Sequence, residues 1–350
     1  MIYLDHAATT PVVPAALEAA WPYLTGEFGN ASSTHELGHR ASVALEDARA
    51  RVASFIGARP TEVTFTSGGT ESDNLGVVGL ALANPRGRHI VSAKTEHEAV
   101  LESIAFLERV HGFEVSWLSV ARDGSIEPST LAAALRPDTT LVTLMLANNE
   151  IGAIHPITAF GELAHQVGAL MHTDAVQALG WMPLNVAELG VDALSFSGHK
   201  MGAPKGVGAF YLRSGLAIEP LLHGGGQEFE VRSGTENVAW AVALATAVDA
   251  LRISGDRGET IAMRDTFIDE VLNTIPRAQL TGPVGEKRSP AIASFVFEGV
   301  SGEAVLLQLE ENGVVVSSGS ACAAGRDDPS HVLLACGYEP GLAQTSVRFS

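Results

Sequence analysis

The sequence predicts an α/β fold in which helices pack on both faces of a central sheet of seven strands. Two observations predict it. Short β-rich runs alternate with helical stretches from about residue 40 to residue 215, which is typical of βαβ units. Several runs are apolar on both faces, as expected for strands that helices cover on each side. The seven predicted strands span residues 63–67, 89–94, 114–120, 140–147, 170–175, 193–198 and 207–213.

Helical stretches are predicted between these strands at residues 40–56, 71–83, 97–111 and 158–167. Residues 239–251 are apolar nearly all round, which indicates a buried helix. Beyond a polar stretch at 253–258 the pattern predicts a second, smaller α+β domain. It would contain a helix, a strand at 292–297, a helix at 302–312 and a strand at 314–317. A last strand at 346–350 would leave an open sheet edge.

The composition excludes several classes of protein. The 350 residues include 40 acidic and 22 basic ones, giving a net charge of −18, which disfavours binding to nucleic acid or to an anionic membrane. The two cysteines, Cys322 and Cys336, cannot form a disulfide framework and favour a reducing compartment. The chain opens without a secretory pattern, and no run has the roughly 20 apolar residues of a membrane span. We therefore expect a cytoplasmic protein.

Lys200 is the strongest candidate for a cofactor-binding lysine. The chain has only four lysines, and Lys200 directly follows an apolar strand in residues 195–208, SFSGHKMGAPKGVG. Enzymes with wound α/β sheets place their chemistry at that edge. A lysine after a strand is more often a solvated loop residue, but Ser197 and His199 beside it supply donors for an anion.

Residues 63–74, VTFTSGGTESDN, combine a strand, a glycine-rich turn and the start of a helix. Free backbone N–H groups and the positive end of the helix dipole would meet there, which favours a phosphate site. The pattern is neither the dinucleotide fingerprint nor the P-loop. A simple helix cap by Ser67 or Thr70 explains the segment equally well.

Two further strands end in polar residues. Asp174 ends the strand in 170–177, LMHTDAVQ, and is followed by Gln177. An aspartate there could pair with a protonated ring nitrogen of a cofactor, or could cap a helix. His97, in 94–100, KTEHEAV, could stack on a ring or transfer protons; a surface cap is the alternative.

Cys322 lies among small and polar residues in 317–329, SSGSACAAGRDDP. A thiol in such a loop is placed as a nucleophile, although most free cysteines are buried and inert. Cys336 lies in an apolar helical stretch and fits the inert type.

The stretch His35-Glu36-Leu37-Gly38-His39 matches the His-Glu-x-x-His pattern of zinc metalloproteases. Gly38 weakens the helix that the pattern needs, and no third ligand is evident. We therefore predict no metal site.

Eleven ordered segments resemble cysteine desulfurases of the NifS/IscS type, in the class V aminotransferase group of pyridoxal phosphate enzymes. The resemblance covers essentially the whole chain. The segments are 3–11 (YLDHAATTP), 29–35 (GNASSTH), 66–72 (TSGGTES), 95–97 (TEH), 148–152 (NNEIG), 174–177 (DAVQ), 197–200 (SGHK), 223–227 (HGGGQ), 232–235 (RSGT), 318–322 (SGSAC) and 346–350 (SVRFS).

The resemblance implies a fold-type I transferase with a seven-stranded, mostly parallel sheet in a large domain, residues 14–252. Residues 1–13 plus 253–350 would form the small domain, with a shortened C-terminal part. It also implies a homodimer with its sites at the subunit interface.

The resemblance also implies a role for each site residue. Lys200 would bind pyridoxal 5'-phosphate covalently, His97 would stack on its ring, and Asp174 would pair with the ring nitrogen. Gln177 and Asn149 would contact the ring-oxygen side. The phosphate would be held by Gly69, Thr70, Ser197 and His199, together with Thr235 from the partner subunit. Arg348 would bind the substrate carboxylate, and Asn149 would also contact the substrate.

The implied reaction converts L-cysteine to L-alanine. The Lys200 amine would remove the α-proton, and the Cys322 thiolate would take the sulfur as a persulfide. The acceptor would be an iron–sulfur cluster scaffold or a tRNA-thiolation carrier. Three alternatives stay open: another pyridoxal phosphate reaction, such as that of a selenocysteine lyase, an aminotransferase or an epimerase; a zinc hydrolase; and an inactive scaffold.

Overall fold

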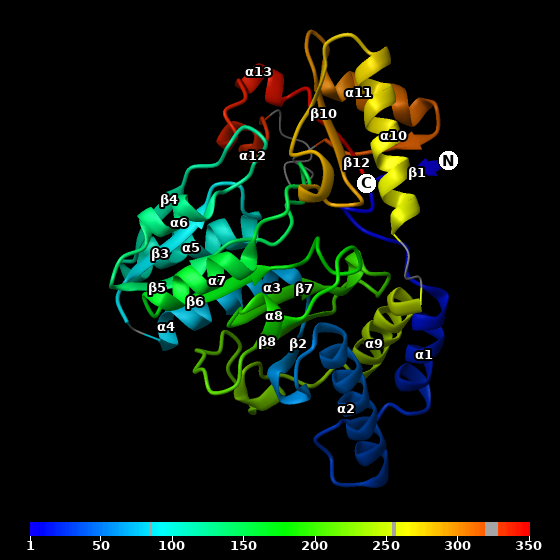
Figure 1. Ribbon diagram of the computed structural model, residues 1–350. Coiled ribbons are helices and arrows are strands. Elements are labelled where there is room, and N and C mark those ends of the chain that lie inside the picture. The colour runs from blue at the N-terminus through cyan, green and yellow to red at the C-terminus, as the bar shows by residue number, and fades with distance from the viewer. Residues whose placement is uncertain (85, 254–256, 319–327) are drawn as a thin grey trace.

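The computed structural model describes residues 1–84, 86–253, 257–318 and 328–350. Within them a seven-stranded sheet forms the centre of the molecule and confirms the predicted α/β fold (Figure 1). The strand order is β2-β8-β7-β6-β5-β3-β4. β8 runs antiparallel to both neighbours, and the other pairs are parallel. The strands are β2 (Val63–Thr66), β3 (His89–Ala93), β4 (Glu114–Leu118), β5 (Thr139–Thr143), β6 (Leu170–Asp174), β7 (Ala193–Ser197) and β8 (Gly208–Leu212).

Each face of this sheet carries its own apolar core, because successive side chains of a strand point to opposite faces. Ile90 packs with Ile104 of α5, whereas Val91 belongs to the core on the other face, with Phe160 of α7. One face is covered by α3 (Gly69–Asn74), α4 (Leu80–Ala83) and α5 (Glu98–His111); the other by α1 (Pro14–Thr25), α2 (Glu36–Ile56), α6 (Pro128–Ala134), α7 (Ile157–Gln166), α8 (Val186–Leu189) and α9 (Val238–Ile253).

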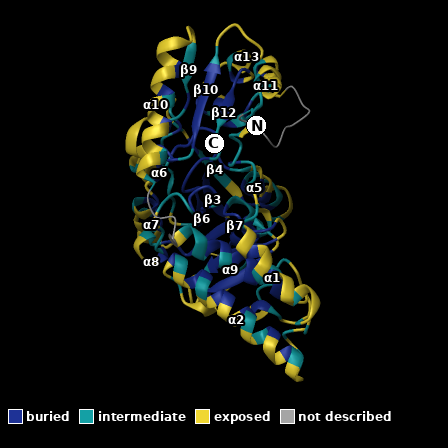
Figure 2. Ribbon diagram, turned by 90° about the vertical axis from the view of Figure 1, so that its right-hand side faces the viewer, coloured by how far each residue is buried: buried dark blue, intermediate teal, exposed yellow. Residues whose placement is uncertain are grey.

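The elements that follow α9 lie together above the large sheet (Figure 1). Their three-stranded sheet has the order β12-β10-β9, and a two-stranded sheet joins β1 to β11. Figure 2 shows β10 and β12 buried while α10 presents an exposed outer surface. The elements are β1 (Ile2–Tyr3), α10 (Gly258–Thr274), β9 (Ala278–Leu280), β10 (Ala293–Phe297), α11 (Gly302–Glu311), β11 (Val314–Val315), α12 (His331–Ala335), α13 (Pro340–Ala343) and β12 (Val347–Phe349).

Several predicted elements need correction. The helix predicted from residue 40 begins at Glu36, because the His35 ring caps it by accepting the Gly38 N–H. The helix predicted at 71–83 begins at Gly69 and contains a π-helical turn over Leu75–Gly79. Sequence patterns missed α1, which buries only Ala16 and Ala20 and so has little apolar periodicity.

The predicted open edge at the last strand is wrong. Ser317 and Arg348 exchange backbone hydrogen bonds on the side of β12 that faces away from β10. Ser350 is bonded to the backbones of Leu4 and His6 in the same way. Chain segments far apart in the sequence therefore cover that edge.

Candidate active site

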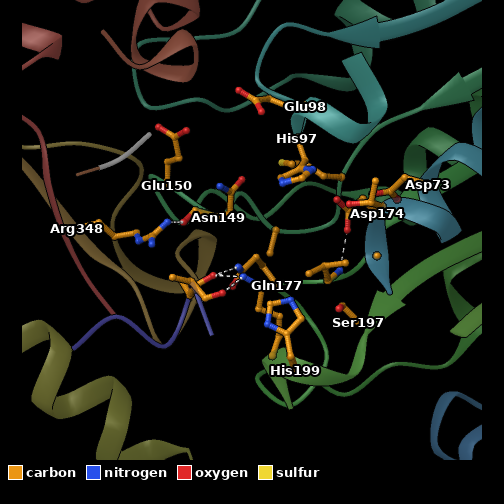
Figure 3. Close-up of a pocket in the computed structure, with 18 of the residues that line it drawn as sticks. Asp73, His97, Glu98, Asn149, Glu150, Asp174, Gln177, Ser197, His199 and Arg348 are labelled. Carbon is orange, nitrogen blue, oxygen red and sulfur yellow. Dashed lines mark hydrogen bonds between the residues drawn. The ribbon is translucent and has the colours of Figure 1, made fainter. Parts of the chain in front are cut away.

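A pocket of about 410 Å³ opens between the carboxyl ends of the central strands and the two chain ends (Figure 3). It brings together nearly all of the residues that the sequence singled out, from segments spread over the whole chain. These residues are Gly69, Thr70, His97, Asn149, Asp174, Gln177, Ser197, His199, Lys200 and Arg348.

Lys200 lies in a single 3₁₀ turn, Gly198–Lys200, immediately after β7. Glycine is needed at position 198, because a Cβ there would lie 2.9 Å from the Val207 carbonyl oxygen. The Lys200 ammonium donates to the carbonyl oxygens of Ala7 and Ala8. The N-terminal segment is thus part of the pocket wall. The resemblance placed this segment in the small domain, but sequence reasoning did not predict these two backbone contacts.

The glycine turn after β2 places the first residues of α3 against the pocket. Gly68 has a φ of +154°, which L side chains rarely adopt. A Cβ on Gly69 would lie 2.9 Å from Val176 and 3.5 Å from the Ser197 Cβ, so the backbone can approach the pocket only as glycine. A helix start whose backbone N–H groups lie near the Ser197 and His199 side chains suits a phosphate group.

His199 is neutral, since burial and the two neighbouring lysines, Lys200 and Lys205, lower its pKa to about 4. Its Nδ1 pairs with the Thr9 hydroxyl at 3.1 Å. The ring is therefore held by the N-terminal segment and serves the pocket through hydrogen bonding.

Asp174 and His97 form the deep side of the pocket. Burial raises the pKa of Asp174, whereas the positive charges that His97 and Lys200 can carry lower it. Its Oδ1 accepts the Val176 N–H at 2.8 Å. His97 Nδ1 accepts the Ala99 N–H at 3.1 Å, so the proton of the neutral ring is on Nε2. His97 is therefore the cap of α5, as predicted, whereas Asp174 holds a turn and not the start of a helix. Both side chains also line the pocket.

Arg348 closes the opposite side and is 1% exposed. One guanidinium nitrogen donates to the Asn149 carbonyl oxygen at 2.9 Å and the other to Asp5 Oδ1 at 2.8 Å. Its buried Nε has no hydrogen-bond partner among the described residues. A buried donor without a partner is unusual and suits an anionic ligand.

The turn that contains Asn149 is rigid, because the Asn148 side chain accepts hydrogen bonds from the backbone N–H groups of Glu150 and Ile151. Gln177 donates to the Ala7 carbonyl oxygen at 2.9 Å. Asn149 and Gln177 are thereby fixed on two sides of the same pocket.

Of the predicted residues that the structure describes, one is not brought into this pocket. Thr235 lines a separate cavity of about 200 Å³ with Ser67 and Arg232. Cys322 lies outside the described residues. Cys336 is buried, and burial raises the pKa of its thiol to about 12, which confirms the prediction that it is an inert, packed thiol.

Sequence reasoning also missed a set of buried acids, Asp73, Glu96 and Glu150. Asp73 is four residues after Gly69 and so faces the same side of the helix, which is a signal that could have identified it. Glu150 accepts from the Ser330 hydroxyl, and the His331 ring pairs with the Glu96 carbonyl oxygen at 3.0 Å. Nothing in the sequence spacing places residues 330 and 331 beside residues 150 and 96.

The described part of the chain contains no group of three or more histidine, cysteine or acidic side chains arranged to hold a metal ion. In the same residues no helix is long and apolar enough to cross a membrane. His35 acts as a helix cap. The zinc-protease pattern is therefore explained by helix capping.

Comparison with known proteins agrees with this geometry. The model of the family "Aminotransferase class-V" matches residues 2–350. Cysteine desulfurase IscS of Dictyoglomus turgidum is 47% identical, with the alignment covering 100% of this chain and 89% of that protein. The IscS-like cysteine desulfurase of Mycobacterium tuberculosis is 46% identical, covering 100% and 91%.

Solved structures give the same result. A NifS-like protein superposes with a TM-score of 0.92 at 34% identity, covering 100% of this chain and 93% of the other. A structure described as SspA in complex with cysteine has a TM-score of 0.88 at 33% identity, covering 100% and 98%. Fold, pocket and relatives agree, and the chain belongs to the class-V aminotransferase family of pyridoxal phosphate-dependent enzymes.

Proposed function

We propose that this protein is a cysteine desulfurase, which removes the sulfur of L-cysteine and releases L-alanine. The observation that carries the proposal is the meeting of Lys200, Asp174 and Arg348 in one pocket. This set supplies an amine for a cofactor aldehyde, a carboxylate for its ring nitrogen and a guanidinium for a substrate carboxylate. Full-length relatives carry the name cysteine desulfurase.

The pocket fits pyridoxal phosphate by its donor set. Gly69, Thr70, Ser197 and His199 would hold the phosphate, with Thr235 of the partner subunit as a further contact. His97 would stack on the ring, and Asn149 and Gln177 would contact its oxygen side. When bound, the cofactor withdraws electrons from the α-carbon of the substrate.

Lys200 has two tasks. Its Nζ would bind the cofactor at rest and then remove the α-proton of cysteine. Two backbone carbonyl oxygens, those of Ala7 and Ala8, accept hydrogen bonds from this Nζ and so aim it into the pocket. Arg348, held by Asn149 and Asp5, would orient the substrate carboxylate so that the α-proton faces Lys200.

Cys322 would receive the sulfur. Its thiolate attacks the substrate sulfur, a sulfur–sulfur bond forms, and the carbon–sulfur bond breaks with its electron pair left on carbon. That carbon takes up a proton, alanine leaves, and the persulfide stays on Cys322. We further propose delivery of this sulfur to an iron–sulfur scaffold or a thiolation carrier.

Assembly and location are part of the same proposal. The site would be completed in a homodimer, in the cytoplasm, with a large domain over 14–252 and a small domain over 1–13 plus 253–350. Because Thr235 lies in a cavity apart from the Lys200 pocket of its own chain, it would serve the pocket of the second subunit.

The test uses the purified holoenzyme with L-cysteine, measuring its visible absorption spectrum, alanine and protein-bound persulfide. We expect a cysteine-dependent spectral change and alanine formation in the wild type. Cys322→Ala should lose persulfide, whereas Cys336→Ala, at the buried thiol, should retain it. Persulfide formation that is equal in wild type and Cys322→Ala would refute the proposal. Alanine formation from selenocysteine but not from cysteine would show that selenocysteine is the substrate instead.

A further inference from the structure

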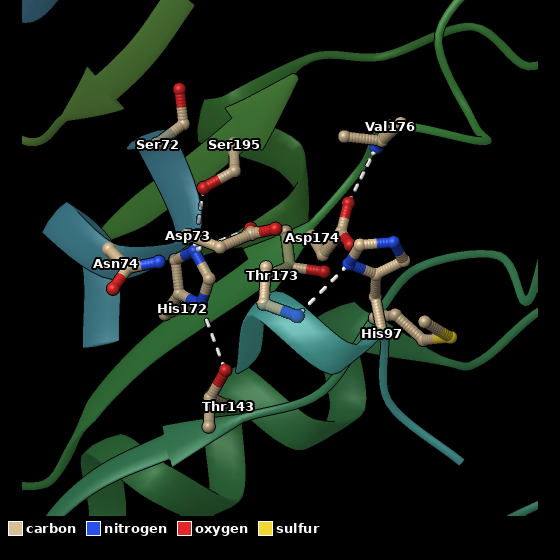
Figure 4. Close-up of polar contacts among 12 residues, drawn as sticks. Ser72, Asp73, Asn74, His97, Thr143, His172, Thr173, Asp174, Val176 and Ser195 are labelled. Atoms are coloured by element: carbon tan, nitrogen blue, oxygen red, sulfur yellow. Dashed lines mark hydrogen bonds and ion pairs between the residues drawn. The ribbon is translucent and has the colours of Figure 1, made fainter. Parts of the chain in front are cut away.

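Three buried carboxyl groups lie close together, two in the wall of the pocket and one, Glu96, outside its lining. Asp73 is 1% exposed, Glu96 is fully buried and Asp174 is 5% exposed. Asp73 and Asp174 both line the pocket. Figure 4 shows Asp73 next to Asp174, with Ser195 and His172 beside it. Like charges this deeply buried cannot all ionise, so the site must distribute protons among them.

Asp174 has partners that favour its ionised form. His97 and Lys200 both interact favourably with its negative charge, and its Oδ1 accepts the Val176 N–H. Burial raises the pKa of Asp174 as well, but these partners oppose the rise, so Asp174 is the carboxyl group of the pair that ionises more readily.

Asp73 has the opposite surroundings. The charged groups that face it are Asp174 and Glu96, both acidic, and burial raises its pKa together with these neighbours. The imidazole of His172, 3.9 Å away, is neutral, because burial lowers its pKa to about 3. Within the part of the chain that the structure describes, Asp73 Oδ1 is buried without a hydrogen-bond partner. Protonation removes the cost of burying an unpaired negative oxygen.

A chain of hydrogen bonds leads from Asp73 into the sheet. The Ser195 hydroxyl hydrogen-bonds to the Asp73 carboxyl group, which opposes the rise in its pKa that burial and the two acids cause. Ser195 also lies 2.9 Å from His172 Nε2. His172 Nδ1 lies 2.8 Å from the Thr143 hydroxyl. Each hydroxyl can donate or accept, and a neutral imidazole has two tautomers, so the chain accommodates a proton on Asp73.

The sequence makes room for this arrangement. Gly76 lies against the His172 ring, and a Cβ there would approach ring atoms to 2.5 Å. It falls in the π-helical turn that follows α3, a type of irregularity that is frequent at functional sites.

We propose that Asp73 is a positioning residue for the cofactor ring: its carboxyl group holds a proton beside Asp174, which leaves the negative charge of the pair on Asp174. This inference rests on the proposed role of Asp174 at the ring nitrogen. Asp73 forms no bond to the ring itself. Because its carboxyl group is neutral, no second negative charge lies beside Asp174. Its side chain also holds the position of the groups that pack against Asp174.

The first test needs no cofactor. Infrared spectra of the apo-protein near neutral pH should contain the carbonyl band of a buried carboxylic acid, and Asp73→Asn should remove one component of it. Glu96→Gln is the matched control, because it removes a different buried acid. A band unchanged by Asp73→Asn would overturn the proposal.

The second test is the pH dependence of unfolding. The folded state binds a proton at Asp73 more tightly than the unfolded state, so this site loses stability as pH rises above the ordinary aspartate value of 3.8. Asp73→Asn should thus gain stability relative to wild type as pH increases. A shift that is equal at every pH indicates a merely structural role and contradicts the proposal.

The third test is a pyridoxal phosphate titration of the apo-protein. Asparagine imitates a neutral carboxyl group, whereas alanine removes the partner of Ser195. Asp73→Asn should therefore bind pyridoxal phosphate about ten times more tightly than Asp73→Ala. Equal losses in both variants would overturn the positioning role. A wild type that binds no cofactor would refute the proposed function and leave the two apo-protein results standing.

Discussion

The two walls of the pocket are built in different ways. The sheet wall lies at the ends of strands of the large sheet and in the turns and helix start that directly follow them. It consists of Gly69, Thr70, Asp174, Ser197 and Lys200. The terminal wall, consisting of Ala7, Ala8, Asn149, Glu150 and Arg348, is assembled from both ends of the chain and one central turn.

This difference matches the two functions proposed for the pocket, which are bond making and breaking on one side and substrate binding on the other. The backbone of the sheet wall is fixed by local geometry, and under the proposed function its side chains would face the atoms where bonds change. Arg348 is held by Asp5, 343 residues away in sequence, and by Asn149, 199 residues away. Changes in the sheet wall should therefore act on kcat, and changes in the terminal wall on KM for the substrate.

The largest effect is expected for Lys200→Ala. Loss of the amine removes both the covalent hold on the cofactor and the base, so alanine formation should fall by about 10³-fold or more. Borohydride reduction followed by mass analysis should find the cofactor attached to the wild type and not to the variant. Lys205→Ala, an exposed lysine in the same loop, is the control. Covalent attachment that survives in Lys200→Ala would break the assignment of the sheet wall.

A smaller effect is expected for Arg348→Lys. Lysine keeps the charge but loses the planar fork, so KM for cysteine should rise about tenfold with a smaller change in kcat. Asp5→Asn removes only the ion pair that orients the guanidinium and should raise KM about threefold. Steady-state kinetics over a range of cysteine concentrations separates the two constants. A loss confined to kcat in both variants would contradict the distinction between the walls.

The same distinction explains how much could be read from the sequence. The seven strands and the residues that follow them were predictable, because strand, turn and helix signals are local. The cover over β12 was not, because it depends on Ser317 and on residues 4 to 6, which only the folded chain brings together. For Asp73, the spacing from Gly69 could have indicated the side of the helix, but its burial beside Asp174, from which its chemistry comes, is not visible in a motif.

The smallest effect is expected at Glu150, and it tests how the terminal wall is held together. It is a buried acid of the terminal wall, and burial raises its pKa although the Ser330 hydroxyl, His331 and Arg348 oppose the rise. The folded state therefore binds its proton more tightly than the unfolded state, and the stability from this site is complete below the ordinary value of 4.5 and is lost as pH rises through the raised value.

Glu150→Gln keeps a side chain that can accept from Ser330 and cannot ionise. We expect thermal unfolding to be nearly unchanged in acid and to occur at a temperature a few degrees higher than in wild type under alkaline conditions. Ser330→Ala, which removes both the donor to Glu150 and the acceptor that caps α12 at the Leu333 N–H, should lower stability across the range. If Glu150→Gln lowered stability most strongly at alkaline pH, Glu150 would be an ionised partner of Arg348, and charge pairing rather than a neutral hydrogen bond would hold the terminal wall together.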